Sequence, residues 1–197
     1  RKPRLLLSRE ALSDNYQRLS SFLGQAECSA SIKANAYGVG IEFAAPVLWD
    51  AGCRTYFVAY LEEALALRSL LPDAVIYAFH GCAPDEFSVA RDKRIRPVIN
   101  ASDEATAHGI ASLSPALHID TGMRRLGIPQ YEFETLSGLM EQCQPSLLMS
   151  HLTSADESNP CRSQHQLTLF ESVRVALGSK CPPSSLANTA GILLGEN

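Results

Sequence analysis

The sequence predicts an α/β fold with a parallel sheet, closed as a (β/α)8 TIM-type barrel. Three observations support this prediction. Short apolar runs alternate with amphipathic stretches in units of about 20–35 residues. Some runs are continuously apolar, among them 56–60 and 74–79, which is typical of strands covered on both faces by helices. The chain has 197 residues, whereas such barrels typically need about 250, so we expect an incomplete barrel.

Eight apolar runs are the strand candidates, and their number favours a barrel over an open doubly wound sheet. They are Leu5–Ser8, Cys28–Ala34, Thr55–Tyr60, Ala74–His80, Arg96–Asn100, Ala116–Thr121, Ser146–Leu152 and Ser185–Ala190. The chain starts at Arg1 rather than Met and stops at Gly195-Glu196-Asn197 without a terminal helix, so we expect a fragment.

Helices are expected between these runs, where apolar residues recur at helical spacing. One helical face is formed by Leu12, Tyr16, Leu19 and Phe22, and similar patterns cover 61–71, 133–140 and 167–177. Capping residues mark the ends: Ser13-Asp14 and Ser102-Asp103-Glu104 at two starts, and Pro72-Asp73 at one end.

Composition and charge exclude several classes of function. Lys and Arg number 17 against 21 Asp and Glu, so no basic field is available to hold a nucleic acid. No apolar run approaches the roughly 20 residues of a membrane span, and the run at Leu5–Leu7 is too short for a signal peptide. The six cysteines are spread singly, which indicates neither a disulfide framework nor a metal site and favours the cytoplasm.

The densest chemical pattern is segment 31–40, SIKANAYGVG. Lys33 lies at the end of a predicted buried strand, where a charged amine is disfavoured and the neutral, nucleophilic form suits a Schiff base. Tyr37 follows four residues later, and two glycines allow a tight turn into the next helix. A plain surface lysine at a strand end is an equally good interpretation from the residues alone. A dinucleotide fingerprint is not, because the third glycine is missing.

Three more polar segments follow predicted strands, namely 118–127, 150–156 and 186–191. Each has a competing interpretation. Asp120 beside Arg124 and Arg125 is compatible with a structural ion pair, and His151 is compatible with an ordinary structural histidine.

Two further patterns are weaker. His151, Ser154 and Asp156 are the residue types of a hydrolase triad, and Cys161 and His165 have metal-ligand spacing in a helix.

What distinguishes Lys33, Arg125, His151 and Asn188 is their position at the ends of different predicted strands. In a barrel these ends converge on one mouth. An amine, a guanidinium, an imidazole and an amide gathered there form a plausible pocket for an aldehyde cofactor.

These segments resemble alanine racemase over essentially the whole chain. The matching motifs are KANAYG at 33–38, DTGM at 120–123 with RLG at 125–127, SH at 150–151, and ANTAG at 187–191. The resemblance implies a pyridoxal 5'-phosphate barrel of fold-type III. Lys33 would hold the cofactor as a Schiff base and act as an acid/base catalyst, and Tyr37 would bind the phosphate. Arg125 would contact the cofactor phenolate and, with Met123, the substrate. His151 would pack on the pyridine ring, and Asn188 and Thr189 would line the phosphate side.

The resemblance also implies which parts lie outside this chain. Racemisation of L- and D-alanine needs an acid and a base on opposite faces of a planar intermediate. In the family the second group is a tyrosine from a C-terminal β-domain of the partner subunit in a homodimer. We therefore expect an extended arm at 1–10, a truncated barrel domain at 11–197, and little activity from the chain alone. The implied product is D-alanine for peptidoglycan.

One departure and two alternatives remain at this point. At His118 the family often has a carbamylated lysine that pairs with the carboxylate-binding arginine, so the sequence leaves open how Arg125 is oriented, and Arg124 stands beside it. The first alternative is a non-catalytic carrier of pyridoxal phosphate, which small fold-type III proteins resemble. The second is a racemase that acts on serine or several amino acids.

Overall fold

Seven parallel strands form a single sheet in the computed structural model, which describes residues 4–194. The strands are β1 (Ala30–Ser31), β2 (Thr55–Val58), β3 (Val75–Ala78), β4 (Ile95–Ile99), β5 (Ala116–His118), β6 (Leu147–Met149) and β7 (Ser184–Ser185). Their order in the sheet is their order in the sequence, with no switch point, as in a barrel and unlike a doubly wound sheet. The predicted barrel type is confirmed. Within the described residues β7 does not pair with β1, so the ring of seven strands stays open.

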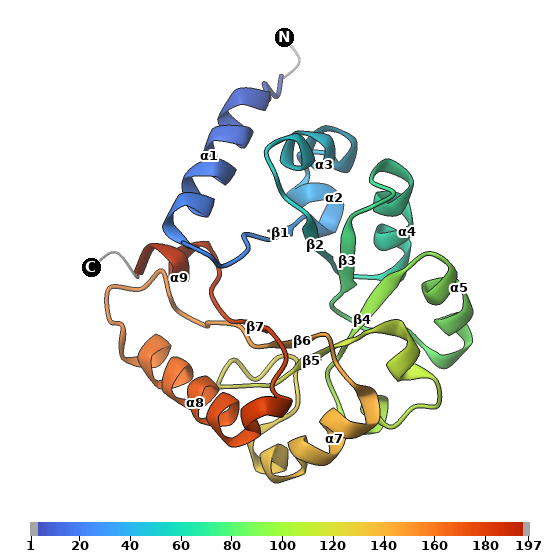
Figure 1. Cartoon of the computed structure of the whole chain (residues 1–197). Helices are drawn as coiled ribbons and strands as arrows, with labels where there is room; N and C mark the ends of the chain where they lie inside the picture. The colour runs from blue at the N-terminus through green and yellow to red at the C-terminus, as the bar shows by residue number, and fades with distance from the viewer. Residues whose placement is uncertain (1–3, 195–197) are drawn as a thin grey trace.

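The helices lie outside the ring of strands (Figure 1). They are α1 (Arg9–Phe22), α2 (Lys33–Tyr37), α3 (Ile41–Asp50), α4 (Leu61–Leu70), α5 (Phe87–Asp92), α6 (Ser102–Ala105), α7 (Leu136–Cys143), α8 (Cys161–Leu177) and α9 (Thr189–Leu194). Short 3-10 turns are η1 (Pro84–Glu86), η2 (Ile110–Leu113), η3 (Gln130–Thr135) and η4 (Gly178–Lys180). None of the helices in 4–194 is long and apolar enough to cross a membrane.

Alternate strand residues face the inside of the ring and fill it. The interior cluster consists of Phe57, Tyr77, Val98, Ala116 and Met149, one residue from each of the five central strands. The Phe57 ring stacks between Tyr77 and Phe79, with centroids 5.1 Å from each. The intervening residues face the helices in the main core, which explains why the predicted strands are apolar throughout.

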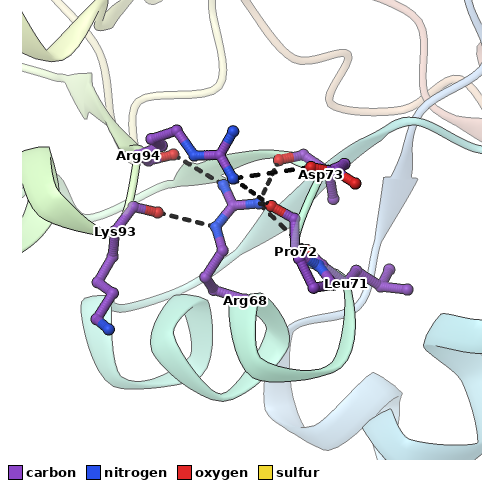
Figure 2. A network of polar contacts seen from close by, with 7 residues as sticks. Arg68, Leu71, Pro72, Asp73, Lys93 and Arg94 are labelled. Atoms are coloured by element: carbon purple, nitrogen blue, oxygen red, sulfur yellow. Dashed lines mark hydrogen bonds and ion pairs between the residues drawn. The ribbon is translucent and has the colours of Figure 1, made fainter.

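Arg68, on α4, holds the bottom of the barrel together (Figure 2). Arg68 is only 9% exposed, and burial lowers the pKa of its guanidinium. It donates hydrogen bonds of 2.7–3.1 Å to five backbone carbonyls, those of Leu71, Pro72, Ala74, Lys93 and Arg94. These carbonyls belong to the turn that leads into β3 and to the turn that precedes β4. One buried cation thereby satisfies two loops that would otherwise leave backbone oxygens unpaired.

The N-terminal region differs from the prediction in two respects. Leu5–Ser8 forms no strand, and Leu5 and Leu6 are 73% and 89% exposed, because no neighbouring strand lies beside them in the described residues. Helix α1 starts at Arg9, not at Ser13-Asp14, because the Ser8 hydroxyl caps it by accepting the Ala11 N–H at 3.1 Å. Residues 1–3 and 195–197, which include the expected chain ends, lie outside the described residues.

The strand segments at the two sides of the open ring are shorter than predicted. Of the run 28–34 only Ala30–Ser31 is strand, and of 185–190 only Ser185 is, together with Ser184. Within the described residues, β1 pairs only with β2 and β7 pairs only with β6. Because each segment has hydrogen bonds to a neighbouring strand on one side, less of its length forms regular strand. Helix α6 begins at Ser102 as predicted, and α4 ends at Leu70, before the predicted Pro72-Asp73 stop.

Candidate active site

The candidate site lies at the carboxyl ends of the strands, one layer above the interior cluster. Counting two residues on from Tyr77, Val98, Ala116 and Met149 leads to Phe79, Asn100, His118 and His151. Because side chains alternate along a strand, these residues also face the inside of the ring. Three of these four residues are polar, whereas the layer below is almost entirely apolar.

Lys33 reaches this layer from the first residue of α2 rather than from the end of a strand, which corrects the predicted position. The chain leaves β1 at Ser31, and Lys33 is half-buried. Its Nζ lies 5.6 Å from the centroid of the Phe79 ring, within range of a cation–π contact. Lys33 is therefore not fully exposed to solvent, and its amine lies beside an aromatic ring at the end of β3.

The segment after Lys33 has an unusual backbone. Ala34, Asn35 and Ala36 have φ of 51–53° and ψ of 46–50°, and Tyr37 has φ 55°, so four successive non-glycine residues are left-handed. Each such residue costs about 1–2 kcal/mol relative to a right-handed turn. The turn brings the Tyr37 hydroxyl to 3.3 Å from Ser31 Oγ while leaving the residue 65% exposed. Tyr37 is thus held at the rim with its hydroxyl near the end of β1.

Two side chains outside the turn's own backbone stabilise it. Glu63, on α4, accepts the Ala34 N–H through Oε1 at 2.7 Å and the Ala59 N–H through Oε2 at 2.6 Å. Asn35 accepts the Ile41 N–H through Oδ1 at 2.8 Å. The carboxylate therefore ties the Lys33 turn to the end of β2, and the amide ties it to the start of α3. The two bonds to the Glu63 carboxylate are charge-assisted, and such bonds are among the stronger hydrogen bonds in proteins.

The pKa of His151 is affected by both Lys33 and Arg125. Burial lowers the pKa of the His151 imidazole, and the positive charges of Arg125 and Lys33 lower it further. Arg124, the neighbouring arginine, lies elsewhere. Its side chain lines a groove of about 1320 Å³ between the loop after β5 and the start of α8. Arg125 is not among the residues that line this groove, and its charge acts on His151 instead.

Asp120 shapes the loop that carries these arginines. Its Oδ1 accepts the N–H groups of Gly122 and Met123 at 2.8 Å, and its Oδ2 accepts that of Arg124 at 2.9 Å. It forms no ion pair with either arginine in the described part of the chain, so the ion-pair interpretation is wrong. The carboxylate therefore folds residues 120–124 into a tight turn directly after β5.

His118 is buried in the interior layer beside Asn100. Its Nδ1 lies 2.9 Å from Asn100 Oδ1. Burial lowers the pKa of His118 to about 4, with Asp120 opposing and His151 and Arg125 reinforcing the shift. The ring is therefore neutral at pH 7.

A buried polar network supports His151 from behind. Gln166, on α8, donates to the His151 carbonyl at 2.9 Å and to Thr121 Oγ1 at 3.2 Å, and it accepts the Thr153 N–H at 2.8 Å. Thr121 Oγ1 also lies 2.8 Å from Ser150 Oγ. This network joins the loops after β5 and β6 to one helix, so the backbone on both sides of His151 is fixed.

Asn188 and Thr189 lie where the chain enters α9. Asn188 accepts the Gly191 N–H at 2.9 Å and donates to the Leu152 carbonyl at 3.4 Å, so its amide caps the turn and touches the His151 loop. Thr189 is exposed at the first residue of α9. The bond to the Leu152 carbonyl places Asn188 beside the loop that carries His151.

The weaker sequence patterns do not assemble. Ser154 Oγ is buried without a hydrogen-bond partner, so it does not form a triad with His151 and Asp156. Cys161 and His165 both line the groove beside Arg124, but residues 4–194 hold no group of three or more His, Cys, Asp or Glu that suits a metal ion.

Three supporting residues escaped the sequence analysis. Asn100 ends a predicted strand, and its interior position follows from the alternation of side chains, so this pattern would have revealed it. Glu63 and Gln166 lie on helices and reach the site from outside the strand ends. No motif or spacing in the sequence marks them.

Known proteins match this chain along most of its length. The family model described as alanine racemase, N-terminal domain, matches residues 7–197. Alanine racemase from Methylobacterium nodulans is 44% identical over 201 residues, which is 98% of this chain and 54% of the relative. Alanine racemase from Rhizobium meliloti is 38% identical over 98% of this chain. The chain thus spans about half the length of these relatives.

Solved structures agree in fold. Alanine racemase from Bartonella henselae, with covalently bound pyridoxal phosphate, superposes with a TM-score of 0.84 at 31% identity, covering 96% of this chain and 57% of that one. Histidine racemase from Leuconostoc mesenteroides superposes with a TM-score of 0.82 at 23% identity, covering 94% of this chain and 53% of that one, which shows the fold alone. On the family model and the sequence identities together, this chain belongs to the alanine racemase N-terminal domain family.

Proposed function

We propose that this chain forms the pyridoxal 5'-phosphate-binding barrel, residues 11–197, of an isomerase that interconverts L- and D-alanine. The observation that supports the proposal most is that the charges of both Lys33 and Arg125 act on the His151 imidazole, although the three residues come from different segments of the chain. The family membership and the relatives named alanine racemase support the same conclusion.

The residues at the mouth fit the cofactor by their chemistry. Lys33 offers a primary amine inside the ring for covalent attachment to an aldehyde. In this proposal His151 presents its neutral ring to the pyridine, and Arg125 binds the phenolate oxygen. Tyr37, Asn188 and Thr189 bind or line the phosphate on the rim. The structure of the Bartonella racemase, which holds this cofactor covalently, supports the assignment.

The chain's own residues then have definite tasks. The bound cofactor supplies an electron sink that makes the α-hydrogen of the amino acid acidic. With the cofactor bound, Lys33 Nζ would hold the proton on one face and move it to or from the α-carbon. Arg125 binds the substrate carboxylate, which orients the α-hydrogen toward Lys33, and Met123 lies in the same loop against the substrate.

Racemisation also needs an acid or base on the opposite face. We propose that a tyrosine of the partner subunit in a homodimer supplies it. In the whole subunit, the barrel would follow an N-terminal arm at 1–10 and would be followed by a C-terminal β-domain. The 197-residue chain by itself is then expected to bind the cofactor but to racemise alanine poorly. We place the protein in the cytoplasm, in keeping with its unpaired cysteines, with D-alanine for peptidoglycan as its product.

A racemisation assay tests the proposal. The homodimeric protein loaded with pyridoxal phosphate is expected to convert L-alanine to D-alanine, and Lys33→Ala to abolish this. Lys93→Ala is the matched control, because Lys93 is exposed at the end of α5, and it should retain full activity. Cofactor binding without racemisation of any amino acid would instead indicate a carrier. Equal rates on serine or histidine would indicate a broader racemase.

A further inference from the structure

The groove beside Arg124 gathers basic side chains outside the candidate active site. It is also lined by Arg162 and His165, which lie in the first two turns of α8. The acidic residue that lines it in the described chain is Asp120, whose carboxylate oxygens already accept the N–H groups of residues 122–124. The groove is therefore basic, although the chain as a whole has a net charge of −4.

The basic side chains of this groove have no acidic partner within residues 4–194. No carboxylate lies within ion-pair distance of Arg124, Arg162 or His165 there. By contrast, Arg174 in the last turn of the same helix pairs with Glu171 at 2.7 Å. Two guanidinium groups that share a groove without an acid repel each other, and an anion from outside the chain would offset this repulsion.

The position of Arg162 is unfavourable for a cation. The first turn of α8 contains no acidic residue, and Pro160 at its N-cap has no side chain that accepts a hydrogen bond. Asn159 accepts the Cys161 N–H at 3.0 Å, and the next N–H groups, those of Arg162 and Ser163, have no acceptor in the described chain. Because the N-terminus of a helix carries partial positive charge, it favours acidic side chains and bound anions. Arg162 adds a further positive charge at this point.

The backbone of Arg124 is strained. Its φ is +55°, in the left-handed region that glycine adopts without cost and other residues do not. The Asp120 carboxylate holds it there by accepting the Arg124 N–H at 2.9 Å. Neither the backbone at 124 nor the helix at 162 benefits from an arginine, yet both arginines line the same groove. Their side chains are therefore better explained by a ligand than by the stability of the fold.

We propose that this groove binds a small polyanion, a molecule with carboxylate or phosphate groups, held by Arg124, Arg162 and His165 at the N-terminus of α8. Guanidinium groups pair with both kinds of anion through two parallel hydrogen bonds. The volume of about 1320 Å³ accommodates a molecule with several such groups. The proposal goes beyond the proposed function and does not depend on it, because it needs neither Lys33 nor the cofactor.

The first test is calorimetric titration of the purified protein with citrate and, separately, with inorganic phosphate, at constant ionic strength. Saturable binding is expected, and binding of only one probe would identify the chemistry of the ligand. Arg124→Gln and Arg162→Gln should each weaken the Kd about 10-fold. Arg18→Gln removes the same charge from an exposed position on α1 and should leave the Kd within about 2-fold. Binding of neither probe, or equal weakening in all three variants, would overturn the proposal.

The second test separates ligand binding from the stability of the fold. Arg124→Gly removes the strained backbone, and Arg162→Glu places an acidic residue in the first turn of α8. Both variants are therefore expected to unfold at the same urea concentration as the parent or at a higher one, and to lose affinity for the anion about 10-fold or more. A saturating anion should raise the Tm of the parent but not that of either variant. Variants that are less stable than the parent and still bind the anion would show that the arginines are structural, and would overturn the proposal.

Discussion

The backbone N–H of Ala34 lies 2.7 Å from Oε1 of Glu63, which joins the residue after the candidate cofactor lysine to the first turn of a helix 29 positions away. The other carboxylate oxygen accepts the Ala59 N–H at 2.6 Å. One side chain therefore holds the left-handed turn against the end of β2. The strained backbone persists because its surroundings over-determine it, as at many functional sites.

Glu63→Gln is expected to weaken this turn. A glutamine has one accepting oxygen, so its NH2 group faces one of the two backbone N–H groups and leaves it unpaired. We expect the free energy of unfolding to fall by about 1–3 kcal/mol, measured by urea denaturation, and the affinity for pyridoxal phosphate to fall with it. The exposed neighbour Glu62 offers the control, and Glu62→Gln should change stability by less than about 0.5 kcal/mol. Similar losses from both variants would show that the two bonds do not matter.

Gly127→Ala is expected to disturb the loop above His118. Gly127 has φ +102°, and an added Cβ would lie 3.0 Å from the Asp120 nitrogen, which is backbone that cannot move aside. We expect a loss of about 2–5 kcal/mol in the free energy of unfolding, from backbone strain and crowding together. Gly138→Ala is the contrasting substitution, since Gly138 lies in α7 with no atom within 4 Å of an added Cβ. It should stabilise the protein by about 0.5–1 kcal/mol. A thermal unfolding series that ranks the two variants the other way would refute this description of the loop.

Arg68→Lys is expected to destabilise the bottom of the barrel. A lysine has three donor hydrogens at one point and cannot reach five carbonyls on two turns. Leaving buried carbonyls unpaired should lower the free energy of unfolding by about 3–5 kcal/mol in chemical denaturation. Arg18, exposed on α1, gives the matched control, and Arg18→Lys should be neutral. Near-parent stability of the Arg68 variant would mean that water replaces the guanidinium without cost.

His118 predicts a pH dependence of stability with a definite sign. Its pKa is about 4 in the folded protein against 6.5 for an unperturbed histidine. Between these values the unfolded chain binds a proton that the folded protein does not, so stability falls as the pH falls. The contribution is about 2 kcal/mol between pH 7 and pH 5. His118→Asn should flatten the dependence by that amount, while His108→Asn, at an exposed position, should leave it unchanged. Parallel curves for parent and His118→Asn would contradict the lowered pKa.

Much of the fold was predictable because helix-covered strands need long apolar runs. Runs such as 55–60 and 74–80 each contain one observed strand, β2 and β3. The edges were not predictable in the same way. Leu5–Ser8 is as apolar as a strand, yet a strand also needs a neighbour, and the sequence does not state which segments pair.

The sequence predicts those site residues that follow directly on a strand, because the carboxyl ends of barrel strands form the site. Lys33, Arg125 and His151 were expected at one mouth, and the charges of Lys33 and Arg125 both lower the pKa of the His151 imidazole. The left-handed turn was not expected, since Ala34 and Ala36 have no intrinsic preference for positive φ and adopt it only because Glu63 and Asn35 hold the turn. Such support comes from elements far away in sequence, so local patterns do not reveal it.

The measurement that tests the central claim most directly is borohydride reduction of the protein after incubation with pyridoxal phosphate, followed by mass mapping of the labelled peptide. Lys33→Arg, treated in parallel, controls for reaction at other amines. Our account predicts a single stable adduct on Lys33 and none in the variant. A folded protein that carries no adduct, or carries it on an exposed lysine such as Lys93, would contradict the assignment of this mouth as the cofactor site.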